Sequence, residues 1–347
     1  MKQRGDAALP GAPPQPATEP TQAADTGQDA ASPPVDAAGD GDAAQAAPAP
    51  AAATSGARPP PPEKPAVLTT TTLGERGPNL PIGVLVGGQR VTAIHVREWT
   101  LGVEKKIGKH RSEAGAMAMT ELLPIVLAEA LHAIGPHNFD GMESIVERRM
   151  IASGLKFADA LYAYVWLRYE ALEHEPVAFD IKCPNCSTSF VFDADLASMD
   201  VRCVPIDTED LRRRFPLRKP IKLHGKEVSE LWIEPQTFGG LDAAFGEEAR
   251  GDSAARDAAM IASSIVGADA FADLQTPFLV DPDQLDDMSK FDLEGLIRDI
   301  EDNTPGPVMA LETKCAKPKC GIDLARLLQP DFDSFFARAS LRTPRKT

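Results

Sequence analysis

The sequence predicts an α+β protein made of two related modules behind a disordered tail. Each module is expected to contain a β-hairpin, helices and a zinc-ribbon-like strand that ends in a cysteine knuckle. Three observations carry this prediction: large apolar side chains are almost absent before about residue 64, one hairpin pattern occurs twice, and each half ends in a cysteine pair. The expected boundaries are 1–75 for the tail, 76–205 for the first repeat, 206–340 for the second repeat and 341–347 for a basic tail.

The N-terminal segment and the overall charge limit the function classes. A segment rich in Ala, Pro, Gly and Asp cannot bury enough apolar surface to offset the entropy lost on ordering. No apolar run approaches the ~18 residues that a membrane helix needs, so a cytoplasmic protein is expected. The net charge of −15 disfavours nucleic acid as a partner. The one basic stretch, Arg212 to Lys226, is interpreted as a solvated helix end and hairpin because it lacks interleaved aromatic residues.

Two segments predict the same hairpin. Apolar residues alternate on both sides of the glycine turn at 87–88, and the pattern recurs around His224-Gly225. With Gly88 aligned on Gly225, an offset of 137, the following positions agree without a gap. The matched pairs are Gln89 with Lys226, Val91 with Val228, Ile94 with Leu231, Val96 with Ile233 and Thr100 with Thr237. This agreement indicates an internal duplication.

Apolar periodicity predicts three helices after the first hairpin. The first carries an apolar face over 122–131 and ends at Gly135. The second is expected to be capped by Asp140, with Glu143 as its capping-box partner, and to stop at Gly154. The third spans about 156–173, where core packing is the expected use of its tyrosines and tryptophan.

The second half repeats this order with fewer apolar positions. Helices are expected near 253–266, ending at Gly267, and near 291–300. Pro176 and Pro307 prevent further helix, and a strand then leads into each cysteine pair, over 177–183 and 308–315. Both strands end in Lys-Cys, which is the second anchor of the repeat.

The cysteine pairs predict a structural metal site. Cys183-Pro-Asn-Cys186 has the spacing of a zinc knuckle, and a closed zinc site needs four ligands. Cys315 and Cys320 supply two more, although their four-residue spacer is long for a knuckle. The sequence therefore predicts one Zn²⁺ shared by Cys183, Cys186, Cys315 and Cys320. Buried inert thiols and a transient disulfide are the alternatives, the latter disfavoured by a reducing compartment. Cys203 is interpreted as a strand or core thiol.

The sequence contains none of the common catalytic motifs, so a non-enzymatic protein is expected. The chain lacks a Gly-Lys-Ser/Thr phosphate loop, a nucleophile elbow and a His-Glu-x-x-His helix, and its six histidines are scattered. A metal-dependent hydrolase would need an open metal position beside a His or Glu, which no spacing provides. The acidic run over 281–287 lacks the central Gly and terminal Glu of a calcium loop and is interpreted as solvated loop.

Part of the first half resembles a known family. The residues concerned run from Met150-Ile-Ala-Ser-Gly154 through Phe157-Ala-Asp-Ala-Leu161 and Leu167-Arg168 to Glu175-Pro-Val-Ala-Phe-Asp-Ile-Lys-Cys183-Pro-Asn-Cys186. This run is similar to the T4-type bacteriophage baseplate (hub assembly) protein family. The hairpin from Ile221 to Ile233 also resembles the opening of phage tail assembly chaperones. The longer Cys315 to Cys320 spacer and the long tail depart from the family pattern.

The resemblance implies a role in assembling the tail baseplate of a contractile phage or a related injection machine. Other phage tail or injection-machine baseplate proteins would then be its partners, and the protein could also be associated with the virion or injection particle. The alternative is a zinc-ribbon adaptor that binds nucleic acid or the transcription machinery through the stretch from Arg212 to Lys226. The choice between virion component and assembly factor stays open, as does the oligomeric state.

Overall fold

The computed structural model describes residues 60–114, 119–237, 253–272 and 278–327. Residues 1–59 of the predicted N-terminal tail and the whole predicted basic tail, 341–347, lie outside these residues. The predicted boundary at residue 75 is wrong, because residues 69–75 form a strand and most of a short helix. The described chain is a mixed α+β fold whose sheets are small and antiparallel. Within these ranges no helix is both long enough and apolar enough to cross a membrane.

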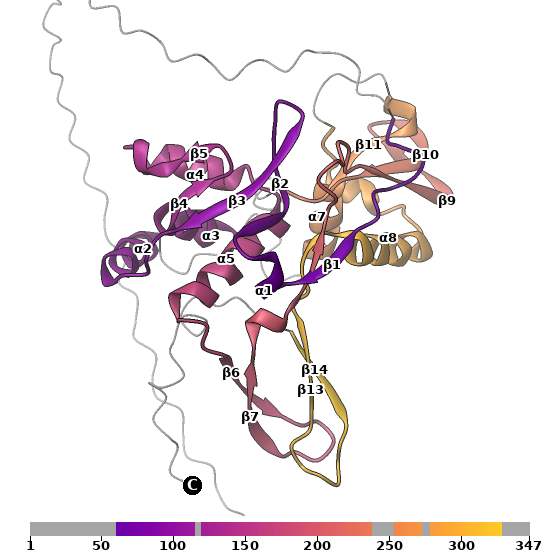
Figure 1. Ribbon diagram of the computed structural model, residues 1–347. Coiled ribbons are helices and arrows are strands. Elements are labelled where there is room, and N and C mark those ends of the chain that lie inside the picture. The colour runs from indigo at the N-terminus through magenta and orange to yellow at the C-terminus, as the bar shows by residue number, and fades with distance from the viewer. Residues whose placement is uncertain (1–59, 115–118, 238–252, 273–277, 328–347) are drawn as a thin grey trace, which may run out of the picture. The chain divides into compact units, whose positions relative to one another are not determined.

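A four-stranded sheet and its helices form the first half of the fold (Figure 1). The predicted hairpin consists of β2 (Asn79–Val86) and β3 (Gln89–Val96), and the sheet continues through β4 (Leu131–Ile134) and β5 (His137–Asn138). The helices are α2 (Leu101–Ala114), α3 (Met119–Ala130), η1 (Phe139–Gly141), α4 (Ile145–Ser153) and α5 (Phe157–Ala171). The hairpin prediction is confirmed.

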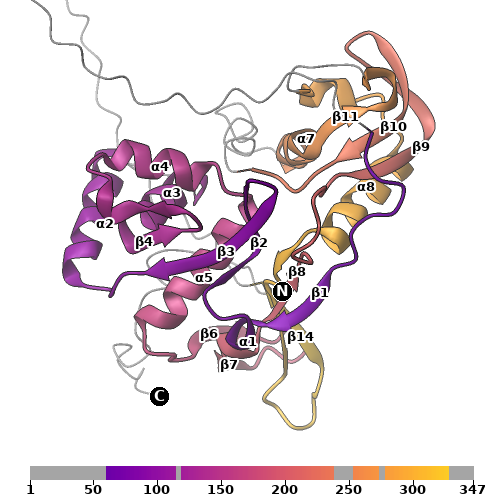
Figure 2. The same ribbon diagram turned by 45° about the horizontal axis from the view of Figure 1, so that its top comes forward.

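A three-stranded sheet carries the second half (Figure 2). Its strands are β9 (Arg213–Leu223), β10 (Lys226–Ile233) and β11 (Ile265–Ala268), in the order β11-β10-β9. The helical segments are α7 (Ser253–Ser264), η4 (Asp269–Phe271), η5 (Pro282–Leu285) and α8 (Lys290–Asn303). The predicted turn at His224-Gly225 joins β9 to β10, with both residues at positive φ.

Segments from both halves pair in a small third sheet. It contains β1 (Thr69–Thr72), β8 (Asp200–Cys203) and β12 (Gly306–Pro307), in the order β1-β8-β12. Two short helices flank it, α1 (Leu73–Arg76) and η2 (Leu196–Ser198). The cysteine pairs lie on two separate ribbons, β6 (Val177–Lys182) with β7 (Ser189–Ala194), and β13 (Ala310–Lys314) with β14 (Asp323–Leu327).

The third strand of each larger sheet pairs with its hairpin in the same register. Ile94 faces Ile134 in the first half, and Leu231 faces Ala268 in the second. In both sheets the register shifts just before the last paired residue of the hairpin strand, which is Val96 in the first half and Ile233 in the second. Beyond the shift, Arg97 N donates to Ala130 O at 2.8 Å, and Glu234 N donates to Ser264 O at 2.9 Å. Arg97 and Glu234 are separated by the same 137 residues that align the two hairpins.

A buried aspartate near the start of a long helix binds the first strand of each hairpin. In α5, Asp159 accepts from the backbone N–H groups of Ile82 and Gly83, at 2.8 and 3.0 Å. In α8, Asp292 accepts from Arg218 N at 3.1 Å. Because unpaired buried N–H groups are costly, each aspartate fixes the position of its helix on the hairpin.

Two predicted helix ends are wrong in the same way. The segment from Leu131 to Gly135 was expected to be helix, but α3 ends at Ala130 and β4 follows directly. The segment from Ile265 to Gly267 likewise forms β11. The exposed edge of the hairpin offers backbone hydrogen bonds to these apolar residues, and that tertiary pairing outweighs helical periodicity.

The predicted cap of the second helix is also wrong. Asp140 lies in η1 and pairs with Arg97 and His132, and the N-cap of α4 is Ser144, whose hydroxyl accepts from Glu147 N. The predicted stop at Gly154 is confirmed. Asp140 is drawn away from capping because two basic groups lie within hydrogen-bond distance.

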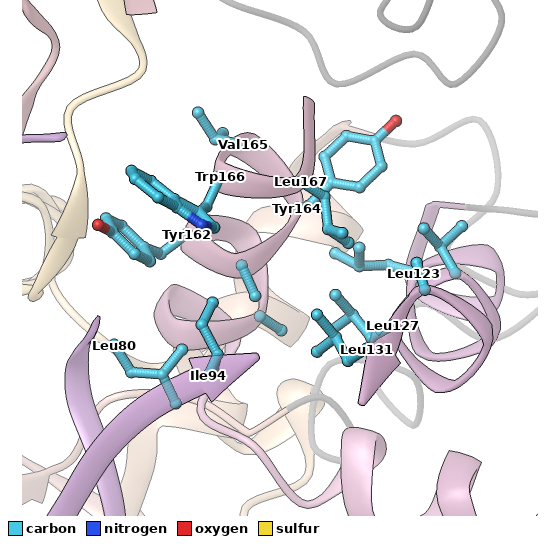
Figure 3. Packing of buried hydrophobic residues seen from close by; sticks show 14 of the residues in the cluster. Leu80, Ile94, Leu123, Leu127, Leu131, Tyr162, Tyr164, Val165, Trp166 and Leu167 are labelled. Atoms are coloured by element: carbon cyan, nitrogen blue, oxygen red, sulfur yellow. The ribbon is translucent and has the colours of Figure 1, made fainter. Parts of the chain in front are cut away.

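The larger core centres on α5, as expected from its aromatic residues (Figure 3). Tyr162 and Tyr164 are fully buried, and they pack with apolar residues of the hairpin and of α3. Other members shown are Leu80, Ile94, Leu123, Leu127, Leu131, Val165, Trp166 and Leu167. A second cluster joins β9, β10, α7 and α8.

Gly83 is the glycine whose replacement should be most damaging. Its φ is +81°, and an added Cβ would lie 2.8 Å from Val91 O. We expect Gly83→Ala to lower the free energy of unfolding by about 3 kcal/mol, since a left-handed backbone and a clash combine. Gly87→Ala, at φ +56° with open space around it, should cost only about 1 kcal/mol. Urea unfolding of both variants checks this, and equal losses would contradict it.

Candidate metal centre

Both cysteine pairs lie in tight turns at the ends of two-stranded ribbons. In the first turn, Ser187 N donates to Cys183 O at 2.9 Å. In the second, Cys320 N donates to Lys317 O at 2.9 Å. The residue after each pair, Ser187 or Gly321, has positive φ, at 57° and 53°. Although the spacer between Cys315 and Cys320 is longer, the residue after Cys320 has the same sign of φ as the residue after Cys186.

The two turns bring the four predicted ligands into one cluster. The Sγ atoms of Cys183, Cys186, Cys315 and Cys320 all lie within 4.8 Å of one another. The shortest separations cross between the ribbons, 3.5 Å from Cys186 to Cys315 and 3.8 Å from Cys183 to Cys320. Figure 1 shows the ribbons β6–β7 and β13–β14 side by side.

This spacing fits a four-coordinate metal ion. A tetrahedral site with metal–sulfur bonds of about 2.3 Å has sulfur–sulfur edges of about 3.8 Å. The four cysteines are free rather than disulfide-bonded. Cys183 and Cys315 are buried, and Cys186 and Cys320 are partly exposed. The cluster could therefore hold one metal ion with four sulfur ligands, which leaves no open coordination position for a substrate.

Neighbouring polar groups favour thiolates at two of the ligands. Hydrogen bonds with the Thr188 side chain and backbone lower the pKa of Cys186 to about 6. Asn185 donates its side-chain N–H to Cys320 Sγ at 3.4 Å, and this bond and the backbone of Ile322 lower the pKa of Cys320. Thiolates are the form that binds metal. The roles of Asn185 and Thr188 have no signal in the sequence, because they depend on the approach of the second ribbon and on the local turn.

The surroundings of one ligand oppose its thiolate form. The Lys317 backbone N–H favours the thiolate of Cys315, but burial and the other three sulfurs outweigh it and raise its pKa to about 12. Four close sulfurs cannot all be charged without a cation between them. Binding of a divalent ion would therefore release protons from this cluster.

Cys203 lies outside the cluster, as predicted. It is the last residue of β8, is 3% exposed and belongs to the larger core. Burial raises its pKa, so it is a poor nucleophile.

The predicted solvated helix end at the basic stretch is wrong. Arg213 begins β9, and both Arg212 and Arg213 are buried. Arg212 pairs with Asp210 at 2.7 Å and Arg213 with Asp299 at 3.0 Å. These two guanidinium groups are used inside the fold, since burial of an unpaired charge would be costly.

The acidic run is largely exposed, and two of the histidines make structural contacts. Asp281 lies in an exposed loop as expected, where it also caps η5 and forms a capping box with Gln284. His132 pairs with Asp140 at 2.8 Å, and His224 Nε2 lies 2.7 Å from Leu279 O. Among the described residues, the four cysteines form the only group of three or more His, Cys, Asp or Glu with metal-binding geometry.

Comparisons with protein families, with curated proteins and with solved structures found no match to this chain. Its function therefore has to be argued from the cysteine cluster and from the sequence.

Proposed function

We propose that the four-cysteine cluster binds one structural Zn²⁺ per chain. The sulfur-only ligand set, its spacing and its four-fold coordination are those that zinc takes in structural sites. Cys183 and Cys186 come from one ribbon and Cys315 and Cys320 from the other, so the metal would join segments more than 120 residues apart. Closing so long a loop favours the folded chain over the unfolded one.

We also propose that the two halves are copies of one module. The matched hairpins, the shared register of β4 and β11, and the aspartates at the starts of α5 and α8 support this. The zinc would then be a clasp between equivalent positions of two copies. The two copies differ most between η4 and α8, where the described residues 278–289 form the short helix η5 rather than a longer helix like α4.

On this basis the protein acts as a non-enzymatic assembly factor or structural component of a phage-type tail or contractile-injection baseplate. The observation that carries the proposal is the closed cysteine cluster that links the two ribbons, which suits a rigid scaffold and offers no site for a reaction. The resemblance of the segment from Met150 to Cys186 supplies the biological context. The alternative adaptor role has less support, because Arg212 and Arg213 are buried in ion pairs.

Co-expression with a set of phage tail and baseplate proteins, followed by affinity purification of this chain, tests the scaffold role. The expected result is a stable complex with at least one tail or baseplate protein. The matched control is Cys183→Ser, which should lose the complex together with the metal, whereas Cys203→Ala should retain both. A chain that binds zinc but ignores every tail protein would contradict the role and leave the metal site intact. A salt-sensitive shift of DNA would favour the adaptor instead.

A further inference from the structure

The sheet of the second half carries a row of three residues, one from each strand. Arg214 in β9 lies opposite Trp232 in β10, and Trp232 lies opposite Gly267 in β11. The indole lies over Gly267, since an added Cβ there would come within 2.5 Å of Trp232 Cε3. Leu231 and Ile233, the neighbours of Trp232, point to the opposite face and belong to the second apolar cluster.

Trp232 is buried without belonging to a core. It is 4% exposed, yet it is a member of none of the apolar clusters among the described residues. Its own face of the sheet therefore has a cover of another kind.

A proline from the start of the described chain lies on this face. The Arg214 guanidinium donates from Nε and Nη2 to Pro61 O, at 2.9 and 2.8 Å. Pro61 is buried, while the prolines on both sides of it are exposed. Glu230 orients the other two side chains, since its Oε1 accepts from Trp232 Nε1 at 3.1 Å and lies 3.7 Å from Arg214 Nη1.

The bound segment has the chemistry of a polyproline ligand. Residues 60–62 are consecutive prolines. Each ring fixes its own φ, and a following proline restricts the residue before it to extended conformations, so little entropy is lost on binding. A proline has no N–H to offer, so recognition has to use its carbonyl and its ring. A guanidinium fork and an indole supply the two kinds of contact.

The first hairpin has no such arrangement. At the positions that match Glu230 and Trp232, 137 residues earlier, the chain has Ala93 and His95. His95 is exposed. Because that hairpin forms without the indole, the carboxylate and a covering proline, these groups are not a requirement of the hairpin fold. A binding role explains why the second hairpin has them.

We propose that Arg214, Glu230 and Trp232, here named the proline site, bind proline-rich peptide segments, and that residues 60–62 of the same chain occupy the site. The ligand class is an extended peptide with consecutive prolines. The Arg214 side chain is 33% exposed and that of Glu230 is 26% exposed, so a peptide in solution can reach the site once the resident segment leaves. The proposal depends neither on the zinc cluster nor on the scaffold role.

A peptide titration into an opened chain tests the site. The labelled peptide has the sequence of residues 60–67, and binding is followed by fluorescence polarisation. In the opened chain, Pro60, Pro61 and Pro62 are all replaced with serine, which removes the buried ring and the fixed backbone. We expect saturable binding to the opened chain and binding at least about tenfold weaker to the unmodified one, because a tethered segment competes at roughly millimolar effective concentration.

Two further substitutions in the opened chain show where the peptide binds. Arg214→Gln should weaken binding by about tenfold or more, since a neutral amide replaces a charged fork that donates two hydrogen bonds. Arg218→Gln is the matched control, because Arg218 is an exposed arginine of the same strand whose guanidinium stacks on Phe291 instead. It should leave binding unchanged. A peptide with serine at the three proline positions should bind at least about tenfold more weakly.

Several results would overturn the proposal. One is no binding to the opened chain, and another is binding that Arg214→Gln leaves unchanged. Equal binding to the opened and unmodified chains would mean that residues 60–62 do not occupy the site. A dimer in light scattering that Arg214→Gln dissociates would mean that the segment comes from a second copy.

A single substitution keeps the proposal testable if the opened chain does not fold. In the ¹⁵N spectrum of the full chain, Trp232→Phe assigns the indole N–H signal of Trp232. Pro61→Ser should shift that signal and leave the indole signals of Trp99 and Trp166 in place. An unmoved Trp232 signal would refute the occupancy by Pro61. Zinc content measured on the same samples shows whether the metal site is intact, so failure of the proline site is separate from failure of the zinc cluster.

Discussion

Cys183→Ser is expected to abolish metal binding and to lower the free energy of unfolding by about 4 kcal/mol or more. Cys183 is buried and its Sγ lies 3.8 Å from that of Cys320, so its loss removes one of four ligands and breaks the link between the ribbons. Elemental analysis of the purified protein should give one zinc per chain before the change and none after it. In thermal unfolding of the variant, the two ribbons should no longer unfold in the same transition as the rest of the chain.

Cys203→Ala is the control for this prediction. Cys203 is buried like Cys183 and Cys315 but lies in the core, so the variant should keep one zinc and lose only the stability that a small cavity costs. Two zinc ions per chain, or none in the unmodified protein, would contradict a shared site. Zinc retained in Cys183→Ser at full occupancy would do the same.

The buried carboxyl of Asp159 is expected to make the protein more stable in mild acid. Burial raises the pKa of Asp159 to about 6, although the N–H groups of Ile82 and Gly83 and the charge of Arg90 oppose the shift. An unfolded chain has the ordinary value near 3.8. The folded state therefore binds this proton more tightly, and stability is gained as the pH falls from about 6 towards 4. The expected gain from this group is about 3 kcal/mol.

Asp159→Asn isolates that contribution. The amide cannot titrate, so the difference in unfolding free energy between the two proteins should change by about 3 kcal/mol between pH 7 and pH 4. Comparing the two proteins cancels the titration of the cysteines and of the other carboxyls, which both proteins share. Denaturant unfolding at four or five pH values measures it. Parallel pH profiles would mean that Asp159 is not titrating in the fold.

Much of the local structure could be predicted because it depends on nearby residues. Two-residue turns between alternating apolar runs specified both hairpins, and Gly154 marked a helix end. The cysteine spacing identified the four residues that cluster, since a short turn between two cysteines leaves few other arrangements. The aromatic residues of α5 cover more than one face of the helix and were correctly expected in the core, because large apolar side chains tend to be buried.

Features that depend on distant parts of the chain could not be predicted in this way. The segment from Leu131 to Ile134 has the composition of a helix end, and only the open edge of β3 makes it a strand. The sequence around Asp140 is typical of a helix cap, but in the fold its carboxylate pairs with Arg97 and His132. Asp159 gives no sequence signal at all, because its partners are backbone N–H groups more than 70 residues away.

The sequence by itself determined which residues could form hairpins, knuckles and metal ligands, because turn chemistry and ligand spacing act within a few residues. Only the tertiary structure decided that the two ribbons bring their cysteines within 4.8 Å and that Asn185 reaches across to Cys320. These outcomes depend on how segments more than 100 residues apart pack, and local propensity carries no information about that distance.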